Sequence, residues 1–508
     1  MEYILGVDLG TSGTKTVLFK KDGQKVASST VEYELIAPKN GWAEQNPDDW
    51  WNATITTIKD VIDKANVNPD DIKGLGISGQ MHGLVMLDKD GKVLRNCILW
   101  CDGRTGKECQ EITDIIGQER LIEITANPAL TGFTAGKIMW VKKHEPQIFE
   151  QCSKILLPKD YIRYKLTDLY GAEVSDASGT NLFDIKAKTW STEILDKLGI
   201  NAEFLPPTKE AVDVAGKISE KASKLTGLTT DTIVCYGAAD NAAAAVGTGV
   251  VSTGKAFTTI GTSGVIFVHA DEAIIDKGGR VHTFCSAVPN KYTVMSCTLS
   301  AGLSLKWFRD NFCSDEVNVA KHLQKDSYDI INEGVDKIEI GANQLIFLPY
   351  LMGERSPILD EKSRAVFVGL SAIHTKYHML RAIMEGVMYS QRQCLDVIKE
   401  MGIKNNLMYA CGGGAKSKLW RQMMADMYDV NVLTVKNEEG PALGVAILAA
   451  VASGMYDSVE SACEVMVQTK ETIKPNLQSH NEYEQYYEIY KKLYPALKES
   501  FESLNKLI

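Results

Sequence analysis

Features that would each define a class of protein are missing from the sequence. The 11 cysteines include no Cys-x-x-Cys pair, and no histidines stand at zinc-ligand spacing around them, so neither a zinc site nor a redox motif is indicated. An odd number of scattered cysteines favours reduced thiols over a disulfide framework. The longest apolar stretch, 442–452, is shorter than the roughly 20 residues that a membrane-spanning helix needs.

An excess of basic charge is also missing. The formal net charge is −10 at pH 7, which argues against nucleic acid or anionic lipid as a partner, although a local basic pocket could still bind a phosphate group. The N-terminus runs directly into a predicted strand, without a basic n-region or a cleavage site. We therefore expect a cytoplasmic protein that binds neither a membrane nor nucleic acid. The sequence leaves a homodimer open.

The chain is too long for one hydrophobic core. Its 508 residues, 44% hydrophobic and 24% charged, have an ordinary globular composition and the length of two large domains or more. A Gly/Thr/Ser-rich stretch at 247–254 is the best candidate for the boundary. We predict an N-terminal domain over residues 1–248 and a C-terminal domain over residues 249–508.

One short pattern occurs twice, near the start of each predicted half. Residues 4–19 read ILGVDLGTSGTKTVLF, and residues 256–268 read AFTTIGTSGVIFV. Each is an apolar strand, a Gly-Thr-Ser-Gly turn and a second apolar strand, which is typical of a β-hairpin. The repetition predicts a duplicated domain with a cleft between the copies. Alignment of the turns places Asp8 opposite Thr259, so only the first copy would bring a carboxylate to the cleft.

Elsewhere, strand patterns alternate with helical ones. Buried strands are predicted at 72–78 and 344–349. Helical periodicity covers approximately 48–65, 375–400, 416–429, 441–454 and 481–505. This alternation predicts an α/β fold.

The first glycine turn has the composition of a phosphate site. Backbone N–H groups of a tight Gly/Thr/Ser turn form a concave anion site, and a lysine adds positive charge. The candidate residues are Thr11, Ser12, Gly13, Thr14 and Lys15. Asp8 is suited to hold a hydrated Mg²⁺, because this ion takes one or two carboxylates together with phosphate oxygens. A plain hairpin turn is the alternative, and neither a Walker motif nor a dinucleotide fingerprint fits, since the segment enters another strand instead of a helix.

A third glycine run, CGGGAKS, occupies 411–417 between a predicted strand and a predicted helix. Strand, glycines and a helix N-terminus in this order are a usual setting for nucleotide binding, because glycine lets the backbone approach the ligand closely. A close-packed turn between strand and helix is the alternative.

The best candidate for a catalytic base is Asp240. It begins a predicted helix with Asn241, and the small residues that follow permit tight packing against a ligand or another helix. In the functional hypothesis, Asp240 accepts a proton from an attacking hydroxyl group while Asn241 hydrogen-bonds the substrate. In the structural alternative, Asp240 is only the N-cap of the helix.

Candidate substrate contacts follow two predicted strands. Met81 and His82 come after the first, and ligands of open α/β sheets sit at the carboxyl ends of strands. Asp102 and Arg104 follow the second, beside Trp100, and polar groups next to an aromatic ring suit a cluster of sugar hydroxyls. The alternatives are a structural hydrogen bond for His82 and a buried ion pair between Asp102 and Arg104.

These residues resemble the FGGY family of carbohydrate kinases over nearly the whole chain. Two long family signatures are matched: GFTAGKIMWVKKH at 132–144, and a stretch from Ala365 through Gly369-Leu370 to Glu385. Signatures of that length are far more specific than any single glycine turn. Shorter segments also fit: SGQMHG at 78–83, WCDGRT at 100–105, YLMGERSP at 350–357 and CGGGAKS at 411–417.

The resemblance implies two ribonuclease H-like domains of the actin/hexokinase type, with an active-site cleft between them, and transfer of a phosphoryl group from ATP to a sugar with the help of Mg²⁺. The shorter segments imply D-xylulose as that sugar. By resemblance, Asp240 is the catalytic base and Asp8 handles metal and phosphate. The residues that would contact the sugar, from the candidates above and from the resemblance, are Met81, His82, Trp100, Arg104, Asp240 and Asn241. ATP would also be bound by Gly261, Thr262, Gly302, Gly413, Gly414 and Ser417, the last near a position where several relatives have Asn.

Two rival functions stay open. Another sugar kinase of the same family, acting on ribulose, gluconate or a related polyol, would share fold and mechanism and differ only around His82, Trp100 and Arg104. A non-catalytic, actin-like ATP-binding protein, such as a filament subunit or a chaperone, would turn ATP over slowly and without regard to sugars. The segments 78–83 and 237–241 have no evident purpose in that second alternative.

Overall fold

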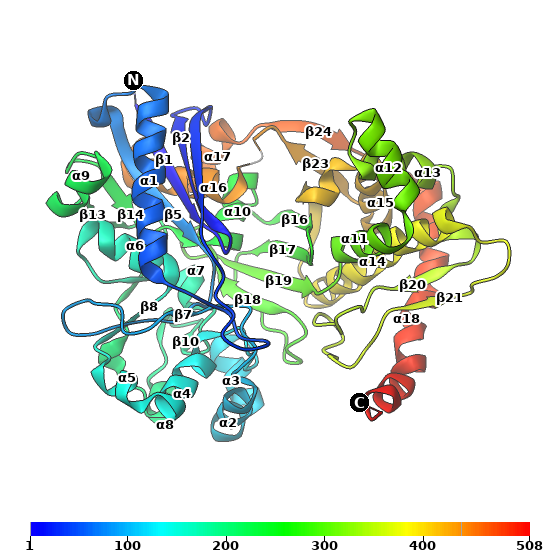
Figure 1. The fold of residues 1–508 in the computed structure, drawn as a ribbon, viewed down its shortest axis with the longest axis horizontal. Helices are drawn as coiled ribbons and strands as arrows, with labels where there is room; N and C mark the ends of the chain where they lie inside the picture. The colour runs from blue at the N-terminus through cyan, green and yellow to red at the C-terminus, as the bar shows by residue number, and fades with distance from the viewer. Residues whose placement is uncertain (1, 438, 508) are drawn as a thin grey trace.

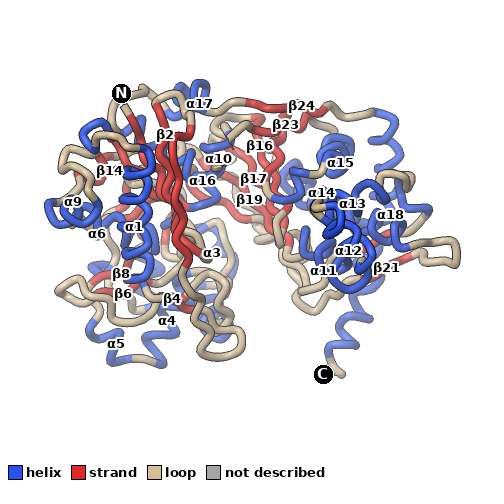
Figure 2. The backbone as a smooth tube through the Cα atoms, turned by 45° about the horizontal axis from the view of Figure 1, so that its top comes forward, coloured by secondary structure: helices blue, strands red, loops and turns tan. Residues whose placement is uncertain are grey.

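The computed structural model describes residues 2–437 and 439–507, and its two halves repeat one topology. Each half is built on a seven-stranded mixed sheet, and helices α10 (Asp240–Thr248) and α16 (Gly440–Ala452) lie between the two sheets (Figures 1 and 2). Among the described helices, none combines the length and apolar character that crossing a bilayer requires.

The first sheet has the order β13-β14-β5-β1-β2-β3, with β15 beside the end of β5. Strands β3, β2 and β1 form an antiparallel meander. Strand β5 runs parallel to β1, and both β14 and β15 run parallel to β5. The strands are β1 (Tyr3–Leu9), β2 (Gly13–Lys20), β3 (Lys25–Glu32), β5 (Ile72–Gly79), β13 (Val214–Lys217), β14 (Ile233–Cys235) and β15 (Ala238–Ala239).

The second sheet repeats this order as β19-β17-β16-β22-β23-β24, with β18 added at the edge. Again an antiparallel meander is followed by parallel strands, here β22 and β23. The strands are β16 (Gly254–Ile260), β17 (Gly264–Ala270), β18 (His282–Cys285), β19 (Tyr292–Thr298), β22 (Asn405–Cys411), β23 (Asn431–Val435) and β24 (Thr469–Ile473). The duplication that the repeated hairpin predicts is therefore confirmed by strand order and direction.

Helices cover the outer face of each sheet. In the first half, α1 (Pro47–Ala65) and α6 (Pro158–Thr167) pack on it, and buried Trp50 and Trp51 of α1 belong to that core. In the second half, α14 (Lys376–Glu400), α15 (Lys418–Tyr428) and α18 (Leu477–Asn505) enclose a separate core. Helices α1, α14, α15 and α18 were predicted from the periodicity of the sequence, because each buries one apolar face, whereas α6 was not predicted.

The remaining elements form smaller layers around this frame. The other helices are α2 (Gly106–Ile116), α3 (Gln118–Thr125), α4 (Thr134–His144), α5 (Pro146–Gln151), α7 (Val174–Ala177), α8 (Thr192–Leu198), α9 (Glu220–Thr226), α11 (Gly302–Phe312), α12 (Ser314–Leu323), α13 (Ser327–Val335) and α17 (Val459–Met466). The other strands are β4 (Glu44–Gln45), β6 (Val85–Leu87), β7 (Cys97–Ile98), β8 (Lys154–Leu156), β9 (Ala172–Glu173), β10 (Phe183–Asp184), β11 (Thr189–Trp190), β12 (Thr208–Lys209), β20 (Ile346–Leu348) and β21 (Val366–Val368).

Helices α10 and α16 cross at very short range. A Cβ atom on Gly247 would overlap the carbonyl oxygen of Gly440, and one on Gly444 would overlap that of Ala243. Glycine at both positions is what allows this approach, since it has no side chain to separate the backbones. Helix α16 also packs on β1 and β5, although it belongs to the C-terminal half of the chain. The crossing thus joins the two halves close to the site described next, since α10 begins at Asp240.

Candidate functional site

The predicted base and the predicted metal ligand lie at the same edge of the first sheet. Asp8 is next to the last residue of β1 and lies beside Ser78 in the parallel register with β5. Strand β15 pairs with the same end of β5, which places Ala238 beside Ser78, and α10 begins with Asp240 directly after β15. Three strand ends therefore bring Asp8 and Asp240 together, where ligands of open α/β sheets bind.

The Asp240 carboxyl group has the properties of a general base. Burial and, after it, the negative charge of Asp8 raise its pKa to about 7. Its Oδ1 accepts hydrogen bonds from the backbone N–H and the side-chain amide of Asn241, at 2.6 and 3.0 Å. The N-cap of α10 is Ala239, so the capping alternative for Asp240 is not what the structure shows. A carboxylate with a pKa near neutral pH can take a proton from a hydroxyl group.

Asp8 is a half-buried carboxylate in a charged neighbourhood. Its Oδ1 accepts a hydrogen bond from Ser78 Oγ at 3.0 Å, and burial raises its pKa above the ordinary value. Lys15 lies opposite Asp8 in the hairpin, and its ammonium is ion-paired with Glu439. The same Glu439 carboxylate binds Lys25 at 2.9 Å. Sequence reasoning missed Glu439, because it enters this site from the other half of the chain.

The first glycine turn is connected to Trp100. The indole Nε1 donates a hydrogen bond to the hydroxyl of Thr11 at 2.9 Å, and that hydroxyl donates to Gln80 Oε1 at 3.1 Å. Trp100 is 47% exposed and Ser12 is exposed at the tip of the turn, so both are open to a ligand. Thr14, in contrast, is fully buried in β2. Its side chain does not reach the surface, which corrects the predicted contact between Thr14 and the nucleotide.

In the second half, the repeated turn rests on the start of α11. The carbonyl oxygen of Thr262 accepts hydrogen bonds from the N–H groups of Ala301 and Leu303, at 3.0 and 3.1 Å. The N–H of Gly302 donates to the carbonyl oxygen of Gly261 at 2.8 Å, and a Cβ atom at position 302 would overlap that oxygen. Position 302 therefore requires glycine for this backbone contact.

The third glycine run lies beside the repeated turn, because β22 is the parallel neighbour of β16 and Thr259 faces Cys411. A Cβ atom on Gly414 would lie 2.5 Å from the Cβ of Ile260, so this run is closely packed against the end of β16. The structure thus brings four of the predicted nucleotide contacts to one place: Gly261, Gly302, Gly413 and Gly414.

A cavity of about 700 Å³ opens between the third glycine run, which lines it with Cys411, Gly412 and Ala415, and helices α10 and α16. Four basic side chains line it: Lys416, Lys418, Arg421 and Lys470. One carboxylate, Glu471, also lines the cavity and is ion-paired with Arg421 at 2.9 Å. The three lysines that remain, beside glycine backbone, fit an anionic ligand such as a nucleotide. The Ser417 hydroxyl accepts a hydrogen bond from the N–H of Trp420 as the N-cap of α15. This cap does not use the hydroxyl's own O–H, so the contact of Ser417 with the nucleotide stays a prediction.

Met81 and His82 form a tight turn after β5, and His82 has a left-handed backbone with φ +66°. Its Nδ1 lies 2.6 Å from the carbonyl oxygen of Gly179, and its ring stacks on Phe133 with centroids 4.4 Å apart. Burial and, after it, the charge of Lys137 hold the pKa of His82 well below its ordinary value. A carbonyl oxygen only accepts, so Nδ1 carries the proton of the neutral ring. The structural hydrogen bond of His82 therefore uses one nitrogen and leaves Nε2 as an acceptor.

The predicted sugar contact of Arg104 is wrong, and the alternative of a buried ion pair is the one observed. The Arg104 side chain is 1% exposed and binds Asp102 and Glu44, each at 2.7 Å. Its guanidinium lies 3.7 Å from the ring centre of Trp42. The group is therefore shielded from solvent by its partners, of which Trp42 and Glu44 come from an earlier part of the chain.

Aromatic rings from both halves surround His82, and sequence reasoning missed them. Phe284 of β18 lies 6.5 Å from the His82 ring, and His282 lies 5.8 Å from Phe133. The side chain of Asn127 connects the halves here, since its Oδ1 is 2.8 Å from His282 Nδ1. The sequence carried a signal only for Phe133, which lies within the first family signature.

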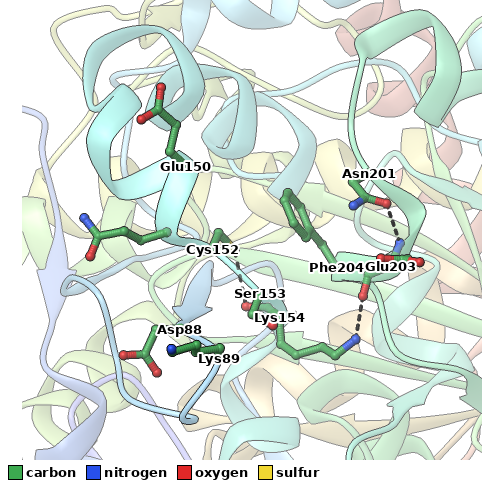
Figure 3. A pocket seen from close by; sticks show the side chains of 10 residues that line it. Asp88, Lys89, Glu150, Cys152, Ser153, Lys154, Asn201, Glu203 and Phe204 are labelled. Carbon is green, nitrogen blue, oxygen red and sulfur yellow. Dashed lines mark hydrogen bonds between the residues drawn. The ribbon is translucent and has the colours of Figure 1, made fainter.

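A second hollow, of about 540 Å³, lies away from these residues on the first half (Figure 3). Its lining mixes both signs of charge, and Lys154 Nζ donates to the carbonyl oxygen of Glu203 at 2.6 Å. It is lined by Asp88, Lys89, Glu150, Gln151, Cys152, Ser153, Lys154, Asn201, Glu203 and Phe204, none of which is a predicted site residue.

Comparisons with known proteins agree with this arrangement. The N-terminal domain of the FGGY family of carbohydrate kinases matches residues 3–247, and its C-terminal domain matches residues 256–453. The chain is 41% identical to the xylulose kinase of Bacillus subtilis over 98% of both chains. A solved structure described as a xyloylose kinase from Brucella ovis is 34% identical, with a TM-score of 0.90 over 98% of this chain and 99% of that one. A gluconate kinase from Lactobacillus acidophilus superposes with a TM-score of 0.92 at 29% identity, over 99% of each chain.

The fold, the paired carboxylates and these matches define the protein as an ATP-dependent sugar kinase. More narrowly, the chain belongs to the FGGY family of carbohydrate kinases. Its two-domain α/β architecture is the one that the sequence predicted from the resemblance.

Proposed function

We propose that this protein phosphorylates D-xylulose at carbon 5, with ATP as the phosphoryl donor. The observation that carries the proposal is the Asp240 carboxyl group, whose pKa of about 7 suits a general base. Asp240 begins α10 beside the end of β5, which leads into the turn of Met81 and His82, called the sugar turn below. Support for the sugar comes from the relatives, since the one from Escherichia coli is also named a xylulose kinase and is 36% identical over 97% of this chain.

The reaction follows from the residues around Asp240. The carboxylate accepts the proton of the sugar's carbon-5 hydroxyl, and the oxygen attacks the γ-phosphorus as the bond to the bridging oxygen of ADP breaks. Asn241 holds Asp240 Oδ1 through two hydrogen bonds, which orients the other carboxylate oxygen for the hydroxyl. Positioning carries most of the rate enhancement in such a transfer, because little covalent chemistry is left to the protein.

The residues present fit Mg²⁺ as the accompanying ion. Asp8 supplies a half-buried carboxylate at the end of β1, and Ser78 holds one of its oxygens by a hydrogen bond. Within residues 2–437 and 439–507, no cluster of three or more His, Cys, Asp or Glu side chains is arranged to hold a metal. That is the pattern of Mg²⁺ sites in kinases, where one or two carboxylates act together with phosphate oxygens and water. Bound there, Mg²⁺ would neutralise charge on the phosphates.

Coupled ADP release across D-xylulose, D-ribulose, D-gluconate and glycerol tests the proposal. We expect the highest kcat/KM with D-xylulose. The likeness to the Lactobacillus acidophilus gluconate kinase makes an aldonate the most informative competitor. A higher kcat/KM with gluconate or ribulose would overturn the choice of sugar, and ADP release that ignores every sugar would overturn the kinase mechanism.

A further inference from the structure

Lys137 is a fully buried lysine beside the sugar turn. It lies in α4 and is 0% exposed, and within the described parts of the chain its ammonium binds backbone carbonyl oxygens and no carboxylate. Asp102 is a carboxylate whose charge acts on it, but that group is bound to Arg104 at 2.7 Å and to the N–H of Ala43 at 2.6 Å. Burial lowers the pKa of Lys137 to about 8. An ammonium that is desolvated without a counter-ion is costly, so it calls for a structural or functional reason.

The Lys137 ammonium joins two turns of the backbone. Its Nζ donates to the carbonyl oxygen of His82 at 2.7 Å and to that of Gly132 at 2.8 Å. Thr134 Oγ1 donates to the same His82 oxygen at 3.1 Å, so that carbonyl has two donors. His82 has the left-handed conformation that non-glycine residues seldom adopt, and such a conformation persists only where the surroundings hold it in place.

The same two turns orient the His82 ring. Phe133 follows Gly132 directly and stacks on the imidazole with an interplanar angle of 27°. Nδ1 donates to Gly179, and Nε2 makes no hydrogen bond within the described residues. Nε2 is therefore free to accept a hydrogen bond from a ligand. The direction in which it points depends on the relative position of the turns at residues 82 and 132.

We propose that Lys137 is a positioning residue that determines sugar specificity: by joining the His82 and Gly132 turns, it aims the Nε2 acceptor at one hydroxyl group of the sugar. The recognised chemistry is a hydroxyl donor, because a neutral ring nitrogen without a proton can only accept. This inference rests on the proposed function. A sugar whose hydroxyl points elsewhere leaves the acceptor unpaired, which is how a buried polar site rejects near-isosteric substrates.

The test replaces Lys137 with methionine, which keeps the length of the side chain and removes its donors and charge. In the full chain, we expect Lys137→Met to raise KM for D-xylulose by about 10- to 100-fold while KM for ATP changes less than about twofold, because only the sugar turn moves. The ratio of kcat/KM for D-xylulose to that for its carbon-3 epimer D-ribulose should fall. An unchanged sugar KM and an unchanged ratio would overturn the proposal.

The same helix offers a matched control. Lys142 also bridges two carbonyl oxygens, those of Leu198 and Gly199 at 3.1 and 2.9 Å, but it makes no contact with the sugar turn in the described structure. Lys142→Met should leave the sugar KM unchanged. If Lys137→Met does not fold, Thr134→Val removes the second donor to His82 and should shift the sugar KM in the same direction by a smaller factor.

A second readout does not depend on turnover. With ¹⁵N-labelled histidine, the wild-type His82 signal, assigned through His82→Gln, should show a single neutral tautomer with the proton on Nδ1. Lys137→Met should give a mixture of tautomers. A single Nδ1-protonated form in both proteins would overturn the positioning role. If instead the wild type phosphorylates none of the sugars yet the tautomer shifts in Lys137→Met, the proposed function fails while the positioning of His82 by Lys137 stands.

Discussion

The two Gly-Thr-Ser-Gly hairpins have the same letters in their turns but different geometry. In the first, Leu9 pairs with Thr14 and Asp8 with Lys15, so four residues form the loop. In the second, Ile260 pairs with Gly264, so only three residues form the loop. A change of one residue in register moves side chains to the opposite face of a strand. The first hairpin therefore sets a carboxylate opposite a lysine, whereas the second sets Thr259 opposite Val265.

This difference separates the work of the two halves. The first half supplies ionisable groups, Asp8 and Asp240, at the ends of its strands. At its glycine turns the second half supplies backbone: Gly261 and Thr262 pack on α11, and the run at 411–417 packs on the end of β16. Proton transfer and metal binding need carboxylates, while a nucleotide needs backbone donors and space. Of the two hairpins, only the first carries a carboxylate beside its turn, and the second half adds Glu439, which is ion-paired with Lys15 of that first hairpin.

The largest effect on activity is expected from removing the charge of the proposed base in the first half, Asp240. Asp240→Asn keeps the shape of the side chain, yet an amide cannot accept the proton. We expect kcat to fall by about 10²- to 10⁴-fold, with ATP binding largely retained. Steady-state kinetics and calorimetric titration with ATP measure the two effects. Asp90→Asn, at an exposed position in the same half, is the control and should match the wild type. Retention of most of the turnover would remove Asp240 from its role.

A second variant makes the first hairpin resemble its repeat. Asp8→Thr replaces the carboxylate by the residue found at the corresponding position 259 of the second hairpin. We expect kcat to fall by about 10- to 100-fold and the Mg²⁺ concentration at half-maximal rate to rise. Thr259→Val changes the corresponding position of the second hairpin and should alter kcat by less than about threefold, because no charge is lost. Equal effects of the two changes would show that the hairpins do not differ in function.

The backbone role of the second half can be tested at Gly302. A Cβ atom there would overlap the carbonyl oxygen of Gly261, so Gly302→Ala must displace the repeated turn. We expect KM for ATP to rise by about 10-fold with a smaller change in sugar KM. Gly106, like Gly302 the first residue of a helix, has nothing within 4 Å of an added Cβ. Gly106→Ala should therefore behave as wild type, and an ATP KM that is insensitive to Gly302→Ala would contradict the assignment.

The smallest expected effect is a shift of the pH profile. Because the pKa of Asp240 is about 7, kcat/KM for the sugar should rise as pH increases through 7, where the carboxyl group loses its proton. The charge of Asp8 contributes to that raised pKa, so Asp8→Asn should move the acid limb to lower pH. The residual activity of Asp8→Asn, measured between pH 5 and pH 9, shows in which direction the acid limb of the pH profile moves. A shift to higher pH would contradict the coupling of the two carboxylates.

Several predictions succeeded because their signals are local. The hairpins at 4–19 and 256–268 appear as β1–β2 and β16–β17, and the helix expected at 375–400 is α14. Period and turn residues report the conformation of their own segment, so these elements can be recognised without knowledge of the rest. The strand expected at 344–349 is also present, shortened to β20.

The errors have the opposite origin. Arg104 was expected in the sugar pocket, but Glu44 and Trp42 reach it from some 60 residues earlier and enclose it. Thr14 lies inside its sheet, where its neighbours bury it. Glu439 and Phe284 reach the site from the second half, and the sequence near the residues that they contact gives no sign of them. The errors at Arg104, Glu439 and Phe284 all concern partners that are distant in sequence.

By itself, the sequence determined the repeated α/β frame, the three glycine segments and the presence of a carboxylate at the start of one helix, because short-range patterns encode backbone conformation. The difference in register between the two hairpins, and the pKa of about 7 at Asp240, arise only in the folded chain. Register depends on pairing between strands, and a pKa depends on desolvation and on charges through space. Neither quantity belongs to a single segment of the chain.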